Sequence, residues 1–159
     1  MPRTPRLEYS NAIYHIVARG DSRRKLFDDS GHYDRFTQGL VDEVDRSSWS
    51  VIAYCWMPNH IHALIRTAHL NLCGGMQHSL SGYANWYAKR NRRTGHLFQG
   101  RYKSFPVEDE GYYWNLSRYI HLNPCRGAKP TTAQHGQASQ QNNNRQSATL
   151  RNWLVFSCD

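Results

Sequence analysis

The segment from Trp49 to Arg66 constrains the fold more strongly than any other part of the chain. It opens with W-S-V-I-A-Y-C-W-M, an almost continuous run of apolar and aromatic residues, which is typical of a central β-strand. Pro58 and Asn59 follow as a turn signal. The next stretch, H-I-H-A-L-I-R, again favours a strand. We therefore expect an antiparallel hairpin whose second strand runs from His60 to Arg66.

Two histidines, His60 and His62, stand one residue apart just after the turn of this hairpin. Successive side chains of a strand point to opposite faces, so both imidazoles lie on one face of the sheet and Ile61 lies on the other. Two imidazoles on one rigid element form a candidate pair of metal ligands. Taken alone, an H-x-H pattern is also typical of ordinary polar strand surface, so other parts of the chain have to decide between the two readings.

Further strands and helices are indicated on both sides of the hairpin. Residues 11–19 (N-A-I-Y-H-I-V-A-R) favour a first strand, which Gly20 and Asp21 end. Apolar residues recur at helical spacing at Tyr33, Phe36, Leu40 and Val44, and again at Met76, Leu80, Tyr83 and Tyr87. We expect the first helix to be capped by Asp28, Asp29 or Ser30. A loop containing Gly74 and Gly75 is expected before the second helix.

The chain continues with a predicted strand over residues 96–105 and a third helix. Acidic residues 108–110 complement the positive end of that helix, and Tyr113, Leu116 and Ile120 form its apolar stripe. The helix is expected to end at or before Asn123–Pro124, because the residue before a proline disfavours the helical conformation.

The charge of the chain points to nucleic acid. Twenty Lys and Arg residues against twelve Asp and Glu give a net charge of +8. Residues 83–103 concentrate that charge and contain no acid. Cations neutralise phosphates and aromatic rings stack on bases, so this stretch suits single-stranded or hairpin DNA. The candidate DNA-binding residues are Lys89, Arg90, Arg92, Arg93, Phe98, Arg101, Tyr102 and Lys103, with Phe105 as a further aromatic side chain.

The third helix supplies a candidate nucleophile and a candidate ligand. Tyr119 and Asn123 are four residues apart and so project from the same helix face. With the histidine pair, an amide oxygen leaves open positions on a divalent ion, which favours Mg²⁺ or Mn²⁺ while zinc stays open. A tyrosine oxygen could then attack a phosphate. From the residues alone, Tyr102, Tyr112 and Tyr113 are rival nucleophiles.

Composition limits the other classes of protein. The chain has room for one domain, and Cys55, Cys73, Cys125 and Cys158 lack metal-binding spacing, so we expect free thiols in a reducing cytoplasm. We find no signal peptide, no apolar run that could cross a bilayer and no phosphate-binding G-x-x-x-x-G-K-[ST] loop. A cytoplasmic, nucleoid-associated protein without a membrane partner or a nucleotide cofactor is expected.

Three motifs carry a resemblance to a known family. They are M-P-N-H-I-H-A-L-I over residues 57–65, R-R-T-G-H-L-F-Q-G-R-Y-K-S over residues 92–104, and R-Y-I-H-L-N-P over residues 118–124. The chain resembles the single-tyrosine HUH transposases of the IS200-like class, and more closely the REP-associated tyrosine transposases. The similarity covers roughly residues 10–127.

The resemblance implies an α/β (α+β) fold, with a central antiparallel sheet flanked by helices in a ferredoxin-like or RRM-like HUH nuclease arrangement. It implies that His60 and His62 are metal ligands, that Tyr119 is the nucleophile and that Asn123 is the third ligand. The implied reaction is metal-dependent cleavage and transfer of single-stranded, REP-like hairpin DNA through a 5′-phosphotyrosine intermediate. Relatives act as monomers or homodimers, and either state is open for this chain.

The end of the chain departs from the family pattern. Residues 1–127 are expected to form the catalytic domain, whereas residues 128–159 are rich in Gln and Asn and are expected to be largely disordered. This departure leaves two rivals to the transposase hypothesis: a non-catalytic regulator that binds hairpin DNA or RNA on the same scaffold, and a metal phosphodiesterase that uses water.

Overall fold

The computed structural model of the chain describes residues 7–127, with side chains described through Leu122. The Gln/Asn-rich tail predicted at residues 128–159 lies outside this range, as do residues 1–6. Along the chain, the elements are β1 (Ile13–Arg19), the short 3-10 helix η1 (Asp21–Arg23), α1 (Ser30–Ser47), β2 (Trp49–Met57), β3 (His60–Thr67), α2 (Leu72–Arg90), β4 (Lys103–Pro106) and α3 (Glu110–Gly127).

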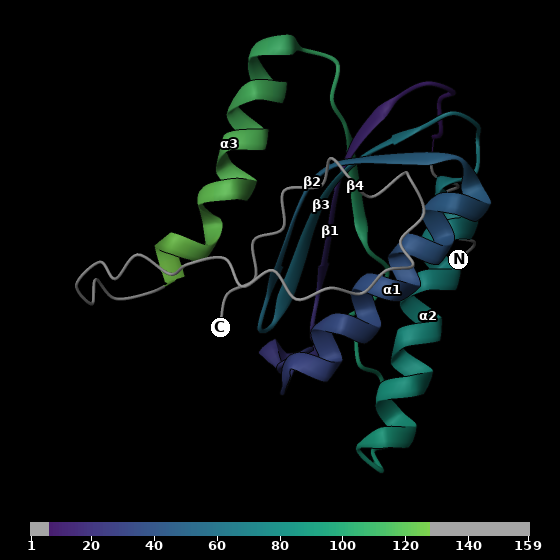
Figure 1. Cartoon of the computed structure of the whole chain (residues 1–159), viewed down its shortest axis with the longest axis vertical. Helices are drawn as coiled ribbons and strands as arrows, with labels where there is room; N and C mark the ends of the chain where they lie inside the picture. Colours follow the sequence, from purple (N-terminus) through teal and green to yellow (C-terminus); the bar gives the residue numbers. More distant parts are fainter. Residues whose placement is uncertain (1–6, 128–159) are drawn as a thin grey trace, which may run out of the picture.

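The four strands form one antiparallel sheet in the order β2-β3-β1-β4. In the unit β1-α1-β2, the two strands lie on either side of β3, which is antiparallel to both. In the unit β3-α2-β4, the two strands lie on either side of β1 in the same way. This is the ferredoxin-like β-α-β-β-α-β arrangement. Figure 1 shows α1 and α2 together on one face of the sheet and α3 apart from them on the other. The predicted fold class is therefore confirmed.

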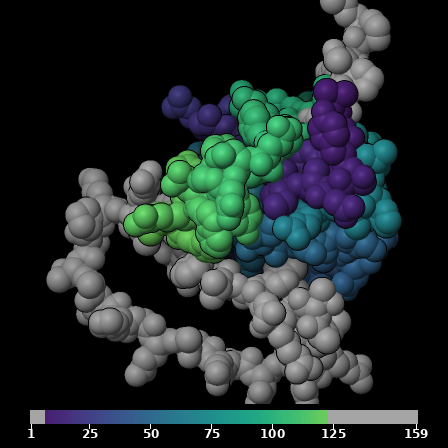
Figure 2. All heavy atoms as spheres, turned by 90° about the horizontal axis from the view of Figure 1, so that it is seen from above, coloured from purple at the N-terminus to yellow at the C-terminus, as the bar shows by residue number. Residues whose placement is uncertain are grey.

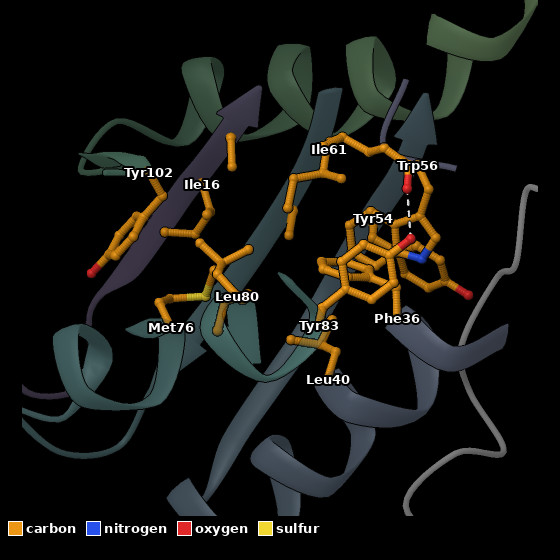
Figure 3. Packing of buried hydrophobic residues seen from close by; sticks show 14 of the residues in the cluster. Ile16, Phe36, Leu40, Tyr54, Trp56, Ile61, Met76, Leu80, Tyr83 and Tyr102 are labelled. Atoms are coloured by element: carbon orange, nitrogen blue, oxygen red, sulfur yellow. Dashed lines mark hydrogen bonds between the residues drawn. The ribbon is translucent and has the colours of Figure 1, made fainter. Parts of the chain in front are cut away.

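The larger hydrophobic core lies between the sheet and the two helices α1 and α2. Strand residues that point to this face, among them Ile16 and Ile61, pack with Phe36 of α1 and Tyr83 of α2. Figure 3 shows these side chains filling the space between the helices and the strands. Burial of this many aliphatic and aromatic side chains is the main force that holds the helices on the sheet.

A smaller core lies on the opposite face, beneath α3. Leu116 and Ile120 of α3 are buried against Ala53 and Cys55 of β2 and Leu64 of β3. Seen from above, the atoms of α3 (green) form a ridge at the surface beside the purple N-terminal part of the chain (Figure 2). This small core fixes α3 over β2 and β3 and leaves part of the sheet beside it uncovered.

The predicted hairpin and the predicted cap of α1 are confirmed. β2 covers the predicted residues, β3 begins at His60, and the Asp29 side chain accepts a hydrogen bond from the backbone N–H of His32. Within α1, Glu43 is buried, where it accepts hydrogen bonds from Ser47 and Arg46.

Three predicted boundaries are wrong. The strand expected over residues 96–105 is confined to β4, because residues before it are held by isolated bonds such as the one from the N–H of Gln99 to the carbonyl of Arg19. Gly74 and Gly75 lie in the first turns of α2 rather than in a loop. α3 continues to Gly127 instead of ending at Asn123–Pro124, although Pro124 has no N–H to donate within the helix.

Candidate active site

The site is built on the face of the sheet that α3 partly covers. Alternation along β3 puts His60 and His62 on the same face as Leu64, which packs against α3. The strand register places residues of β1 and β4 beside the histidines. Arg19 pairs with His60, Val17 pairs with both His62 and Lys103, and His15 pairs with Phe105. Three strands therefore contribute side chains to one polar surface.

His62 is the more buried of the two histidines, with 7% of its surface exposed. Its Nδ1 lies 3.0 Å from Nε2 of His15 on the neighbouring strand. Burial, helped by the nearby His15 and His60, lowers the pKa of His62 to about 4. The ring is thus neutral at physiological pH, which is the form that binds metal ions.

His60 is half-buried at the start of β3. Its Nδ1 lies 2.7 Å from Oδ1 of Asn59, the preceding turn residue, and the carbonyl of Asn59 accepts a hydrogen bond from the N–H of Gly20. Burial lowers the pKa of His60, and the positive charge of Arg19 adds to this effect. The turn is therefore tied to β1, and it orients the first histidine.

Tyr119 reaches the histidines from α3. The centroid of its ring lies 5.8 Å from that of His62, and the two rings are perpendicular. The burial of Leu116 and Ile120 fixes the side of α3 that faces the sheet, and Tyr119 keeps 38% of its surface exposed. Tyr119 therefore lies beside His62 and is accessible from solvent. Tyr112, a rival nucleophile, lies two turns earlier in α3.

The donor set fits a divalent ion that keeps open coordination positions. Nδ1 of each histidine is engaged, by Asn59 in one case and by His15 in the other, which leaves the two Nε2 atoms as possible ligands. Within residues 7–127, no group of three or more His, Cys, Asp or Glu side chains could hold a metal ion. Further donors would have to be of another kind, such as an amide, water or phosphate oxygen. The side chain of Asn123 lies outside the described part of the chain, so its role as a ligand stays a prediction.

The predicted DNA-binding residues occupy different places. Lys89 and Arg90 lie at the end of α2, on the side of the sheet away from the histidines. Arg90 is also engaged, because its guanidinium pairs with Asp29 at 3.1 Å and lies over the ring of Trp86. Arg92, Arg93 and Arg101 are exposed in the segment between α2 and β4. Lys103 is exposed on β4, where it faces the histidine side of the sheet.

The two aromatic members of the predicted set differ in the same way. Phe98 is half-buried and bridges to Gly20 at the end of β1. Tyr102 is only 5% exposed and belongs to the core on the α1–α2 face, so its ring is not available to stack on a base. Phe105, by contrast, is exposed on the histidine side, with its ring centroid 6.1 Å from that of His15.

Sequence reasoning did not assign two residues that the fold brings to the site, His15 and Arg19. Both lie on β1, at alternate positions with Val17 between them. Alternation along the strand indicates that the three side chains share one face. It could not be used without the pairing of β1 with β3, which joins segments far apart in the chain.

The fold is thus a ferredoxin-like α/β sheet with two histidines on one face and a tyrosine of α3 packed against them. Residues 8–123 match the family model described as transposase IS200 like. This match covers most of the chain, so the chain belongs to the IS200-like transposase family, whose chemistry is DNA cleavage and strand transfer during transposition. Transposases of this family generally use a divalent metal ion.

Two of the solved structures that resemble this chain are a transposase and a candidate transposase. The REP-associated tyrosine transposase bound to a REP hairpin superposes with a TM-score of 0.66 at 12% identity, over 80% of this chain and 74% of that one. A candidate transposase from Deinococcus radiodurans R1 superposes with a TM-score of 0.50 at 16% identity, over 75% of this chain and 96% of that one. At these identities the likeness concerns the fold. No curated protein matches the chain, and no helix within residues 7–127 has the length and apolarity needed to span a membrane.

Proposed function

We propose that this chain is a single-tyrosine DNA strand transferase that cleaves single-stranded DNA through Tyr119. The observation that carries the proposal is the contact between the rings of Tyr119 and His62 on an exposed sheet face. Family membership supports the class of reaction. The solved relative that was bound to a REP hairpin supports hairpin DNA with a single-stranded flank as the substrate.

In the proposed reaction, Oη of Tyr119 attacks the scissile phosphorus in line with the leaving 3′ oxygen. The bond from phosphorus to the tyrosine oxygen forms as the bond to the 3′ oxygen breaks. The tyrosine hydroxyl loses its proton and the leaving oxygen gains one. The products are a 5′-phosphotyrosine and a free 3′-hydroxyl. Attack by another 3′-hydroxyl reverses these changes and joins two strands, so the proposed transfer needs no nucleotide cofactor.

We assign the metal site to Nε2 of His60 and Nε2 of His62, with Asn123 as the third ligand. A bound Mg²⁺ or Mn²⁺ ion would polarise the scissile phosphate as a Lewis acid. The chain's own contribution is burial, which keeps both imidazoles neutral, and the contact of Nδ1 of His60 with Asn59, which orients the first ring.

The flanking cations are assigned to phosphate binding. Arg19 of β1 lies beside His60 of β3. Lys103 lies on the same face, on β4, which pairs with the other edge of β1. Both are exposed, so they could neutralise phosphates next to the cleavage point without losing their own hydration first. Arg92, Arg93 and Arg101 extend this positive surface beyond the sheet. Phe105 offers a ring on which a base of the single strand could stack.

A denaturing gel tests the proposal directly. The substrate is a hairpin oligonucleotide with a single-stranded flank, labelled at its 3′ end because a 5′-phosphotyrosine retains the strand downstream of the cut. Incubation with Mg²⁺ or Mn²⁺ should yield a labelled band that migrates with the protein. Tyr119→Phe should reduce that band by on the order of a thousandfold or more, because the attacking oxygen is lost.

Tyr112→Phe is the matched control, since Tyr112 lies on the same helix and is also exposed. It should form the adduct at the wild-type rate. An adduct that persists in Tyr119→Phe would disprove the nucleophile assignment. Cut strands without an adduct would identify a phosphodiesterase that uses water. Tight hairpin binding with neither product would identify a non-catalytic regulator.

A further inference from the structure

His15 makes a close contact with His62 that the proposed reaction does not explain. It is only 8% exposed, lies on β1, and brings its Nε2 to 3.0 Å from Nδ1 of His62 on β3. On its other side it meets the ring of Phe105 on β4. A histidine held between two strands in this way has little freedom to rotate.

The geometry of the contact is that of a hydrogen bond and not of ring stacking. The two rings are tilted by only 15° and their centroids are 5.3 Å apart. The distance between the centroids equals the 3.0 Å between the two nitrogens plus the distance from nitrogen to ring centre in each imidazole. The imidazoles therefore meet edge to edge and nearly in one plane, so the lone pair of one nitrogen points along the N–H of the other.

One proton lies between these two nitrogens, and its position decides what His62 can do. If Nδ1 of His62 carries the proton and Nε2 of His15 accepts it, Nε2 of His62 keeps its lone pair for a metal ion. If His15 donates, the proton of neutral His62 sits on Nε2 and blocks that nitrogen as a ligand. The hydrogen bond of a neutral histidine thus selects the tautomer.

His60 offers an internal comparison. Its Nδ1 lies 2.7 Å from the amide oxygen of Asn59, and an amide oxygen can only accept. The proton of neutral His60 is therefore on Nδ1, and its lone pair is on Nε2. A site in which both histidines bind one ion through equivalent atoms needs the same arrangement at His62.

We propose that His15 is a positioning residue that accepts a hydrogen bond from Nδ1 of His62 and so fixes His62 in the tautomer that presents Nε2 to a divalent cation. This role rests on the metal-site part of the proposed function. It gives His15 no contact with DNA and no part in bond breaking.

The first test is NMR of the metal-free protein with ¹⁵N-labelled imidazoles, at neutral pH and without DNA. His62→Gln identifies the resonances of His62. The proposal expects the proton of His62 on Nδ1 in the wild-type protein, and a proton on Nε2 would overturn it. This measurement needs no substitution at His15, so it holds even if a variant folds poorly.

The second test compares two substitutions of the same buried residue. His15→Gln places an amide oxygen near the position of Nε2 and keeps an acceptor, whereas His15→Leu keeps an apolar side chain of moderate size and removes it. The affinity for Mn²⁺, measured by titration calorimetry, should fall by about 10- to 100-fold in His15→Leu. His15→Gln should recover most of that loss. His69→Leu is the control, because His69 is exposed and lies beyond the end of β3 that is opposite the histidine pair.

Equal Mn²⁺ affinity in wild type and His15→Leu would overturn the positioning role, as would an equal loss in His15→Gln and His15→Leu. Neither readout involves cleavage. A protein with the expected tautomer and Mn²⁺ affinities that forms no Tyr119 adduct would therefore reject the proposed function and keep the role of His15. A Tyr119 adduct together with an unchanged Mn²⁺ affinity in His15→Leu would support the proposed function and reject the role of His15.

Discussion

Three histidines share one face of the sheet, and for each of them burial shifts the pKa in the same direction. His15, His60 and His62 all have lowered pKa values, and burial is the largest cause in every case. A buried imidazolium would lose its hydration without a carboxylate to replace it. The three rings are therefore held neutral, and neutral imidazole is the form that can bind a metal ion.

This arrangement predicts how stability depends on pH in the metal-free protein. The usual histidine pKa is 6.5, and that of His62 in the folded protein is about 4. Between these values the unfolded chain binds more protons than the folded one, so the free energy of unfolding is highest above pH 6.5 and falls as the pH drops toward 4. Each group that takes up a proton contributes a slope of at most about 1.4 kcal/mol per pH unit.

Chemical denaturation of the wild type and of His62→Gln at several pH values measures this slope. Glutamine does not titrate in this range, so the variant should lose less stability between pH 6.5 and pH 4. Identical slopes for the two proteins would contradict the lowered pKa of His62.

At the scale of single residues, strand alternation was sufficient to predict that His60 and His62 share one face of the sheet, while the roles of the histidines and of Tyr119 stay predictions. It was not sufficient for His15 and Arg19, because their place beside the pair depends on the register between β1 and β3. The burial of Tyr102 has a simpler cause. Tyr102 and Phe105 are three positions apart, so an extended chain sends them to opposite faces, and only Phe105 reaches the histidine side.

At the scale of elements, α3 holds the proposed nucleophile while a small core holds α3. Ile120 is fully buried against that core, directly next to Tyr119 in sequence. Ile120→Ala should weaken the docking of α3 by about 2–5 kcal/mol and slow adduct formation even though Tyr119 is intact. Hydrogen exchange of the α3 amides and the denaturing gel measure the two effects. Leu122→Ala, at an exposed position of the same helix, should change neither.

The start of α2 gives a second prediction at this scale. A Cβ atom on Gly75 would run into the indole of Trp49 and lie 2.8 Å from Oε1 of the buried Glu43, whereas a Cβ on Gly74 meets nothing. Gly75→Ala should therefore destabilise the protein by about 1–3 kcal/mol, as overpacking does. Gly74→Ala should be neutral or stabilise it by up to about 1 kcal/mol, through helix propensity alone. Thermal unfolding of the two variants decides between these outcomes.

The same pair shows why the boundary of α2 was missed. Adjacent glycines locally favour a loop, but here the close approach of Trp49 requires one of them and the helix tolerates both. The opposite occurred at the end of α3, where a proline was expected to stop the helix and did not. Elements with strong periodicity or a long apolar run, such as α1 and β2, were predicted from local sequence because their own pattern of burial determines them.

At the scale of the whole molecule, the fold separates the basic residues into two groups. One group, Lys89 and Arg90, ends α2 on the helix-covered face, and the other, Arg19 and Lys103, flanks the histidines. In Figure 1 the end of α2 lies at the bottom of the view. The exposed residues Arg92 and Arg93 follow directly after α2 along the chain.

The placement of charge, and not the net charge of +8 alone, should control DNA affinity. Lys103→Ala and Arg35→Ala each remove one positive charge, but Lys103 lies on the histidine face and Arg35 lies exposed on α1, on the opposite side of the sheet. If Lys103 contacts a phosphate, its loss should reduce the slope of log affinity against log salt by about 0.7–0.9, because one fewer counterion is released on binding. Arg35→Ala should leave the slope unchanged. Fluorescence anisotropy of a labelled hairpin at several salt concentrations measures both slopes, and equal reductions in the two variants would mean that binding responds only to total charge.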